Sequence, residues 1–212
     1  MIITVDGPAA AGKGELTGRL AVHFGYARLD TGKLYRAVGF AVLAAGADPE
    51  DEAAAVKAAR ALSADDLEAS GLRSQEAAAA ASKVAAIPAV RDVLMDFQRS
   101  FASTPPGGLK GAVFDGRDTG TVVIPDAPAK LFLTASPEVR TQRRVKQLQE
   151  QGTEAIYGRV LRELKERDAR DTSRKVAPLK PAEDALVIDT SNMDADAVYG
   201  LALEFISTKT KD

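Results

Sequence analysis

The amino-acid sequence alternates between short runs of β-branched or aromatic residues and longer segments that have apolar residues at helical spacing. The short runs, which we predict to be strands, are Ile2–Val5, Tyr26–Leu29, Ala112–Asp115, Lys130–Leu133 and Leu186–Asp189. Strands that alternate with helices favour an α/β fold, because each helix connects two parallel strands and covers the sheet. We therefore predict a parallel sheet flanked by helices.

Local signals indicate where two of the helices begin. In Ser136-Pro137-Glu138, a capping residue is followed by a proline at the first helical position and an acid near the positive end of the helix dipole. Asp194 or Asp196 can cap the last helix. Its apolar positions, which we expect to face the sheet, are Val198, Leu201, Leu203 and Phe205.

Two segments do not fit the strand–helix alternation. Residues 47–90 are rich in alanine and contain no convincing strand, so we interpret them as a helical insert over the edge of the sheet. The loop Pro105–Gly108 ends this insert. Residues 136–175 are predicted to form an arginine-rich helical hairpin that is broken at residues 151–153.

The composition excludes several classes of protein. The 212 residues are enough for one domain with a sizeable core. The absence of cysteine excludes disulfides and thiolate metal sites and suits the reducing cytosol. His23 is the single histidine, so a histidine metal site or a Ser-His-Asp triad is implausible, and we assign it no function. Neither a secretory leader nor an apolar stretch of roughly 20 residues is visible, so we expect a cytoplasmic protein that binds no membrane.

The charge is unevenly distributed along the chain. The net charge is −2, yet residues 140–175 contain 11 of the 28 Lys and Arg residues and only 6 acids. A local basic segment in an acidic chain indicates a compact polyanionic ligand rather than a nucleic-acid polymer. A solvated helix surface would explain the same charge equally well.

A glycine-rich loop follows the first predicted strand. Gly7-x4-Gly12-Lys13 precedes a helical pattern, which is the context that a phosphate-binding loop requires. Its glycines let backbone N–H groups approach phosphate oxygens, the helix N-terminus adds positive charge, and Lys13 reaches the β/γ-bridge. Many NTPases bind Mg²⁺ through a Ser or Thr after this lysine, but here the residue is Gly14. We therefore expect no direct protein ligand for Mg²⁺, and we favour a small-molecule kinase over a GTPase or motor ATPase.

Charged residues cluster where predicted strands end, which is where open parallel sheets bind ligands. The second strand leads into Leu29–Arg36 and the third into Asp115-Gly116-Arg117-Asp118. Each motif alone is compatible with a salt-bridged turn, but beside a phosphate loop they indicate an acceptor pocket. Arg167, Asp171 and Arg174 have the spacing of one helix face. Such a face either forms internal ion pairs only or clamps a transferring phosphoryl group.

Six segments together resemble the bacterial cytidylate kinases: "DGPAAAGKG", "LDTGKLYRA", "SKVAAIPAVR", "DGRDTGTVVIPDAPAK", "RRVKQLQEQG" and "KERDARDTSRKVAPL". The resemblance covers nearly the whole chain and implies the P-loop nucleoside monophosphate kinase fold, with a five-stranded parallel core. It implies a single kinase domain over residues 1–212, with a core at 1–46, 109–140 and 176–212, a shortened acceptor-binding insert at about 47–108 and an arginine-rich lid at about 141–175. The implied reaction is transfer of the ATP γ-phosphoryl group to CMP or dCMP with Mg²⁺, and we expect a monomer.

The resemblance also implies roles for individual residues. Those expected to bind ATP are Gly7, Pro8, Ala9, Ala10, Ala11, Gly12, Lys13, Gly14, Glu15 and Arg143. Those expected to hold the acceptor are Thr31, Arg36, Arg117 and Arg174 at its phosphate, Ser82, Arg91 and Asp118 at its base, and Arg167 and Asp171 at its sugar, with Asp115 beside them. The expected catalytic residues are Lys13, Arg117, Arg167 and Arg174, and the lid candidates are Arg140, Arg143 and Arg144.

The chemistry of cytosine agrees with the implied base contacts. An acid such as Asp118 accepts from the N4 amine of cytosine, and an arginine donates to its N3 and O2. Uracil presents a carbonyl at position 4, which would repel the acid. Each buried polar group left unpaired costs about 1–3 kcal/mol, so we expect a preference for cytosine over uracil.

Two departures from the family pattern are visible. Residues 47–81 look too short and too helical for the small antiparallel sheet that the family's insert commonly contains. Glu15 replaces a hydroxyl residue, and a carboxylate there hinders ATP binding unless it points away from the phosphates.

Two other functions are compatible with the phosphate loop. A kinase for another small acceptor, such as shikimate or dephospho-coenzyme A, would share the loop but not the Asp-Gly-Arg-Asp and Arg-x3-Asp-x2-Arg motifs. An ATP-binding regulator could transmit lid closure to a partner without phosphorylating any acceptor.

Overall fold

A computed structural model describes residues 1–63 and 65–209. The chain forms two compact units. The first contains residues 1–29 and the chain from Pro105 onward, and the second contains Asp30–Thr104. We describe each unit by itself.

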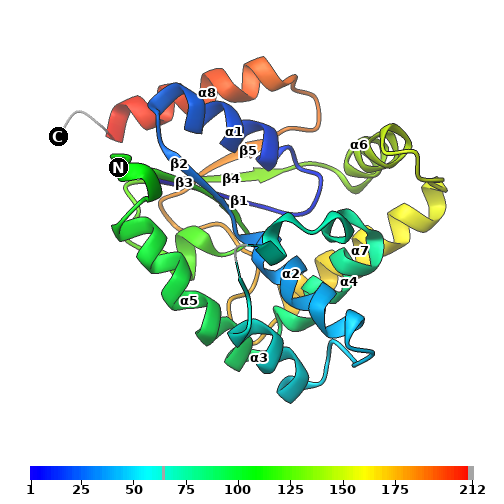
Figure 1. The fold of residues 1–212 in the computed structure, drawn as a ribbon. Helices are drawn as coiled ribbons and strands as arrows, with labels where there is room; N and C mark the ends of the chain where they lie inside the picture. Colours follow the sequence, from blue (N-terminus) through cyan, green and yellow to red (C-terminus); the bar gives the residue numbers. More distant parts are fainter. Residues whose placement is uncertain (64, 210–212) are drawn as a thin grey trace. The chain divides into compact units, whose positions relative to one another are not determined.

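The first unit is built on a parallel sheet (Figure 1). Its strands are β1 (Ile2–Asp6), β2 (Ala27–Asp30), β3 (Ala112–Gly116), β4 (Ala129–Thr134) and β5 (Leu186–Asp189), and only the last residue of β2 belongs to the second unit. Their order is β2-β3-β1-β4-β5, and β1 pairs in parallel with both β3 and β4. The sequence therefore predicted all five strands, with ends that differ by at most one residue.

Two helices on one face of the sheet form the main core of the first unit. Helix α1 (Lys13–Phe24) and helix α8 (Ala195–Lys209) lie side by side there (Figure 1). They bury apolar side chains against the central strands, where Ile3 and Val5 have no exposed surface. Central parallel strands are covered on both faces, which explains why β1 reads as an almost continuous apolar run.

The last helix begins as the sequence indicates but faces the core with a different set of residues. Asp194 provides the cap, because its Oδ1 accepts a hydrogen bond of 2.8 Å from the Ala197 N–H. Ala202 and Ile206 are fully buried together with Val198, whereas Leu201 is 42% exposed. The prediction that Leu201 faces the sheet is wrong, since the helical spacing from Val198 places positions 202 and 206 on the buried side.

The predicted arginine-rich hairpin is confirmed as two packed helices. Helix α6 (Pro137–Glu150) starts at the cap Ser136, whose Oγ accepts from the Val139 N–H at 3.3 Å. Gly152, with φ of 73°, lies in the break before helix α7 (Tyr157–Ser173). Leu148, Val160 and Leu164 form a small core between the helices, and Ala9 packs against it.

The first unit also contains short helical turns, of which one lies in a loop that the sequence indicates. A 3-10 turn, η3 (Pro106–Gly108), lies in the proline–glycine loop. A π-helical turn, η4 (Thr119–Val123), follows β3 and brings its first residues to the end of β1.

The second unit is helical, as predicted for the insert. Its elements are α2 (Thr31–Ala44), α3 (Glu52–Arg60), η1 (Asp65–Glu68), η2 (Ser70–Arg73), α4 (Gln75–Val84) and α5 (Pro88–Ser103). In the described part of residues 47–81 there is no strand, so the small antiparallel sheet is missing as expected. Helices α2 and α4 pack closely, since a Cβ on Gly39 would lie 2.8 Å from the Cβ of Ala80.

None of the helices within the described residues is long and apolar enough to cross a membrane.

Candidate active site

The phosphate-loop residues form a tight turn between β1 and α1. Gly7 has φ of 144° and Gly12 has φ of 96°, conformations that side chains with a Cβ rarely adopt. A Cβ on Gly7 would lie 2.0 Å from the Leu133 carbonyl oxygen, so the loop packs directly on the backbone of β4. Gly7 is therefore required both for the turn and for the close approach, and Gly12 for the turn.

The loop ends in a helix N-terminus suited to an anion. Gly12 is the N-cap of α1 and no side chain caps the helix there, so its first-turn N–H groups face outward without a competing side-chain acceptor. Lys13 is 6% exposed, and its Nζ donates to the Pro8 carbonyl at 2.8 Å, which folds the lysine back over the loop. Glu15 is exposed at the surface of α1.

Two arginines of α6 fix the loop from the side. Arg140 donates to the Ala9 carbonyl at 3.4 Å and forms a two-pronged ion pair with Asp168 of α7, at 3.2 and 2.6 Å. Arg143 donates to the hydroxyl and carbonyl oxygens of Thr190 at 2.9 and 2.7 Å. The Thr190 Oγ1 lies 3.2 Å from the Ala11 carbonyl, so Arg143 is connected to the loop through one residue.

The third lid candidate differs from these two. Arg144 donates to the Gln147 side-chain oxygen on its own helix at 2.7 Å. Asp168 and Thr190, which position Arg140 and Arg143, were not among the sequence candidates, because nothing local to either residue distinguishes it from an ordinary surface polar residue.

Asp6 is a buried carboxylate at the end of β1 that sequence reasoning also missed. It accepts hydrogen bonds from the Thr119 N–H, the Thr119 hydroxyl and the Gly120 N–H at 2.8–2.9 Å. Burial raises the pKa of Asp6 from 3.8 to about 6, the hydrogen bonds oppose this shift, and the nearby Asp118 adds to it. Asp6 therefore fixes the turn after β3, where the next site residues lie.

Asp115, at the end of β3, lies between two cations. Its Oδ1 is 4.0 Å from Lys13 Nζ, and its Oδ2 is 3.8 Å from a guanidinium nitrogen of Arg28 on β2. The side chain of Asp115 is 11% exposed, so the group of charges is partly shielded from water. Arg28 was not predicted as a site residue.

Three arginines surround Asp171 in what we call the arginine cluster: Arg117, Arg167, Arg174 and Asp171 itself. Asp171 is 1% exposed and accepts from Arg174, while Arg117 and Arg167 lie 3.4 and 3.8 Å from its Oδ2. The helical spacing correctly predicted that Arg167, Asp171 and Arg174 share one face. Arg117 joins them from the end of β3, which spacing alone could not predict.

The arginine cluster has an excess of two positive charges, since three guanidinium groups surround one carboxylate. Two charges match a phosphate dianion, and arginine presents the forked donors that phosphate oxygens accept. Asp118, the neighbour of Arg117, is 5% exposed.

In the second unit, the predicted residues lie on three helices. Asp30, rather than Thr31, caps α2: its Oδ1 accepts from the Lys33 N–H at 3.1 Å, and its Oδ2 pairs with Arg36 at 2.7 Å. Asp30 has the extended backbone of a cap, and Thr31 is the first helical residue.

The two predicted base-recognition residues of this unit are buried. Ser82 on α4 and Arg91 on α5 are each 2% exposed. Arg91 donates to the Ala85 carbonyl at 3.4 Å, and its guanidinium lies over the ring of Tyr35 at 5.8 Å. A buried arginine held in this way presents a fixed donor group rather than a mobile one.

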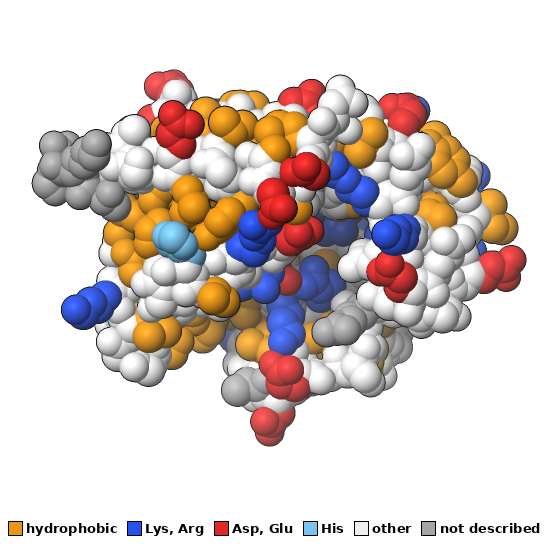
Figure 2. Space-filling view, turned by 90° about the horizontal axis from the view of Figure 1, so that it is seen from above, with side chains coloured by type: hydrophobic (Ala, Val, Ile, Leu, Met, Phe, Trp, Pro, Cys, Tyr) orange, Lys and Arg blue, Asp and Glu red, His pale blue; other side chains and the backbone are white. Residues whose placement is uncertain are grey.

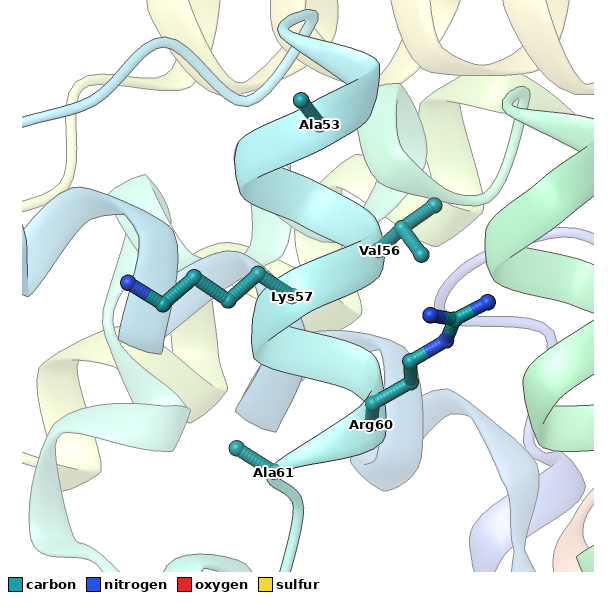
Figure 3. A pocket seen from close by; sticks show the side chains of 5 residues that line it. All are labelled: Ala53, Val56, Lys57, Arg60 and Ala61. Carbon is teal, nitrogen blue, oxygen red and sulfur yellow. The ribbon is translucent and has the colours of Figure 1, made fainter.

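Two further surface features are formed by residues that were not predicted to belong to the site. A shallow depression of about 410 Å³ is lined by Ala53, Val56, Lys57, Arg60 and Ala61, which all come from α3 or its end (Figure 3). Hydrophobic side chains gather around the single histidine on the face shown in Figure 2. His23 packs edge-on against Phe24 and Tyr199, with ring centroids 4.7 and 6.1 Å apart, so its contacts are those of a packing residue.

The comparisons with known proteins agree with this geometry. A family model described as "Cytidylate kinase" matches residues 3–208. The cytidylate kinase of Paramagnetospirillum magneticum is 62% identical over 208 residues, covering 98% of each chain. That of Rhodospirillum rubrum is 53% identical over 211 residues, covering 100% of this chain and 99% of the other.

A solved structure of an uncharacterized protein from Eubacterium ventriosum has the same fold. It covers 98% of this chain and 99% of its own, with a TM-score of 0.56 and 15% identity. At that identity the likeness concerns the fold alone. Because the family model and the relatives each span almost the whole sequence, the chain belongs to the cytidylate kinase family of nucleoside monophosphate kinases.

Proposed function

We propose that this chain transfers the γ-phosphoryl group of ATP to CMP or dCMP and releases ADP with CDP or dCDP. One observation supports this most directly: the same unit contains an uncapped helix N-terminus after a glycine loop and a cluster of three arginines around one carboxylate. These are two anion sites of different construction, as transfer between two nucleotides requires.

The donor is assigned to the loop. Residues 7–15 would hold the ATP phosphates through backbone N–H groups, and Lys13 would leave the Pro8 carbonyl to contact the β- and γ-phosphates. Arg143 is proposed to act on ATP from the lid at about residues 141–175, where it already connects to the loop through Thr190. The exposed Glu15 does not obstruct this arrangement if it keeps its present position.

The acceptor phosphate is assigned to Arg117 and Arg174, with Arg167 and Asp171 at the sugar. Asp171 holds the three guanidinium groups in place before substrate arrives, so the site needs little rearrangement to receive a dianion. Thr31 and Arg36 are also assigned to the acceptor phosphate. Ser82 and Arg91 of the insert at about residues 47–108, and Asp118, are assigned to the recognition of cytosine.

The side chains present fit a magnesium ion that arrives with the nucleotide. Gly14 offers no hydroxyl, and the described residues contain no group of three His, Cys, Asp or Glu side chains placed to hold a metal. Mg²⁺ commonly keeps several waters and binds through phosphates and one or two carboxylates. Asp115 is the carboxylate beside Lys13, so we propose that it holds the ion through water. When bound, Mg²⁺ would neutralise the charge that develops on the phosphates.

The chemical step follows from the charges. An oxygen of the acceptor phosphate attacks the γ-phosphorus while the bond from that phosphorus to the β–γ bridging oxygen breaks, and the electron pair leaves with ADP. The attacking oxygen is already anionic, so no strong general base is needed. The main obstacle is the repulsion between two anions, which Lys13, Arg117 and Arg174 reduce by neutralising both partners.

An acceptor panel tests the proposed function. ADP release from ATP is measured with CMP, dCMP, UMP or AMP present, and with Lys13→Gln as the inactive control. We expect CMP and dCMP to be phosphorylated with a kcat/KM roughly tenfold to hundredfold above that for UMP, because Asp118 and Arg91 would face the wrong base edge. A preference for UMP or AMP would contradict the assignment of the base, and ATP binding without any acceptor-dependent release would favour a regulator.

A further inference from the structure

Arg28 is a charged residue beside the phosphate loop to which the family resemblance assigns no role. It lies on β2, and its side chain is 38% exposed. One guanidinium nitrogen lies 3.8 Å from the Asp115 carboxylate, whose other oxygen lies 4.0 Å from Lys13. Arg28 is thus the second cation on the carboxylate that faces the loop lysine.

Two glycines of α1 leave room for this guanidinium. A Cβ on Gly14 would lie 3.4 Å from Nη2 of Arg28, and a Cβ on Gly18 would lie 3.7 Å from Nη1. The two positions are one turn apart on the same helix face. Glycine is unfavourable inside helices. A pair of glycines on this face therefore indicates that the space beside the first turn is needed for the Arg28 side chain. A side chain longer than that of alanine at position 14 would compete with Arg28 for this space.

A buried hydroxyl orients the guanidinium. Arg28 Nε donates to the Thr17 Oγ1 at 3.0 Å, and Thr17 itself donates to the Gly14 carbonyl at 3.2 Å. The direction of both hydrogen bonds is fixed, since arginine can only donate. With Nε held in this way, Nη2 lies beside Gly14 and Asp115 at the first turn of α1, and Nη1 lies beside Gly18.

This position is informative because of what other P-loop proteins place there. They hold Mg²⁺ between the hydroxyl of the residue after the lysine and a carboxylate at the end of a neighbouring strand. Here the residue after the lysine is Gly14, the carboxylate is Asp115, and the guanidinium of Arg28 lies next to both.

We propose that Arg28 is a donor-binding residue that contacts the phosphates of the bound nucleotide and supplies part of the charge neutralisation that a hydroxyl-bound Mg²⁺ supplies in other P-loop proteins. The proposal rests on the proposed function, because it requires the donor phosphates to lie on the loop. It implies that nucleotide binding in this chain depends less on metal than it would with an apolar residue at position 28.

Equilibrium binding of ADP to the full-length chain, measured with excess EDTA and with Mg²⁺, tests this. For Arg28→Leu we expect the metal-free Kd of ADP to rise on the order of tenfold, because a charge-assisted hydrogen bond to phosphate is lost. The Kd in Mg²⁺ rises less, so the ratio of the two values increases. Arg28→Lys keeps the positive charge but loses the forked guanidinium donors. Its ratio of the two Kd values should lie between those of the wild-type chain and Arg28→Leu.

Two control variants make the result decisive. Arg19→Leu removes an arginine of helix α1 that pairs with Asp196 at 2.8 Å, and it should leave the ratio unchanged. Lys13→Gln should weaken ADP binding under both conditions, and if it does not, the proposed phosphate site itself fails. If Lys13→Gln weakens binding but Arg28→Leu and Arg28→Lys keep the wild-type ratio, only the assignment of Arg28 fails. In that case a lower melting temperature of Arg28→Leu would identify a purely structural link between β2 and α1.

Discussion

At the scale of single residues, the site depends on polar groups that the fold forces into unusual surroundings. Asp6 is the clearest case, since it is a carboxylate buried at the end of the central strand and surrounded by hydrogen-bond donors of residues 119–120. Its burial stabilises the protonated form, and this makes folding stability depend on pH. The contribution of Asp6 to the free energy of unfolding therefore increases as the pH falls.

Asp6 should make the wild-type protein lose stability as the pH rises from about 4 to above 6. The pKa of Asp6 is raised from 3.8 to about 6, so in this interval the folded state binds more protons than the unfolded state. The stabilisation is complete well below pH 3.8, and it is lost as the pH rises past the folded-state pKa of about 6. The difference corresponds to about 3 kcal/mol.

Denaturant unfolding of the wild-type chain and of Asp6→Asn at several pH values measures this contribution. Other carboxylates titrate in both proteins, so the quantity to follow is the difference between their free energies of unfolding. That difference should shift against the wild type by about 2 kcal/mol between pH 4 and pH 6.5. A difference that does not vary with pH would show that Asp6 keeps an ordinary pKa.

At the scale of elements, sequence patterns predicted what is locally encoded. The strands and the helical hairpin were predicted nearly to the residue, because runs of β-branched residues and caps such as Ser136 act over a few positions. The face shared by Arg167, Asp171 and Arg174 was predicted for the same reason, since helical spacing defines it.

The missed residues depend on contacts between elements. Arg28 stands on a short strand and becomes informative only once Gly14, Gly18 and Asp115 are placed around it. Asp6 looks like an ordinary strand end until the turn after β3 is seen to donate to it. The orientation of α8 was partly wrong because a helix with apolar residues on several faces leaves its buried side undetermined by sequence.

The contact between α2 and α4 gives a testable case of packing between elements. A Cβ on Gly39 would lie 2.8–2.9 Å from atoms of Ala80 and Ala81, including backbone atoms that cannot move aside easily. Gly39→Val should therefore lower the free energy of unfolding by about 1–3 kcal/mol, as expected for overpacking. Chemical denaturation measures the change.

Gly200→Val is the matched control. Gly200 lies in helix α8, and a Cβ there would meet no atom within 4 Å, so the same substitution should change the free energy by no more than about 0.5 kcal/mol. Equal effects at the two positions would mean that helix propensity, rather than the close approach of α2 and α4, governs Gly39.

At the scale of the whole molecule, we propose different tasks for the two anion sites. The loop is proposed to hold its nucleotide through backbone groups and a buried lysine, whereas the arginine cluster is assembled from the end of β3 and from α7 around a single carboxylate. Backbone donors bind phosphates in every state of the reaction, while arginines can strengthen their contacts as charge moves onto the transferring group. A change in the arginine cluster should consequently affect turnover more than donor binding.

Arg174→Ala tests this division of tasks. Arg174 pairs with Asp171 at the end of α7, where it is proposed to neutralise the acceptor phosphate. We expect kcat with CMP to fall on the order of a hundredfold or more, while the KM for ATP changes little. Arg159→Ala, which removes an exposed arginine of the same helix that pairs with Glu163 at 2.8 Å, should leave both constants unchanged. Normal turnover in Arg174→Ala, or a loss confined to ATP binding, would exclude the arginine cluster from phosphoryl transfer and confine Arg174 to holding α7 in place.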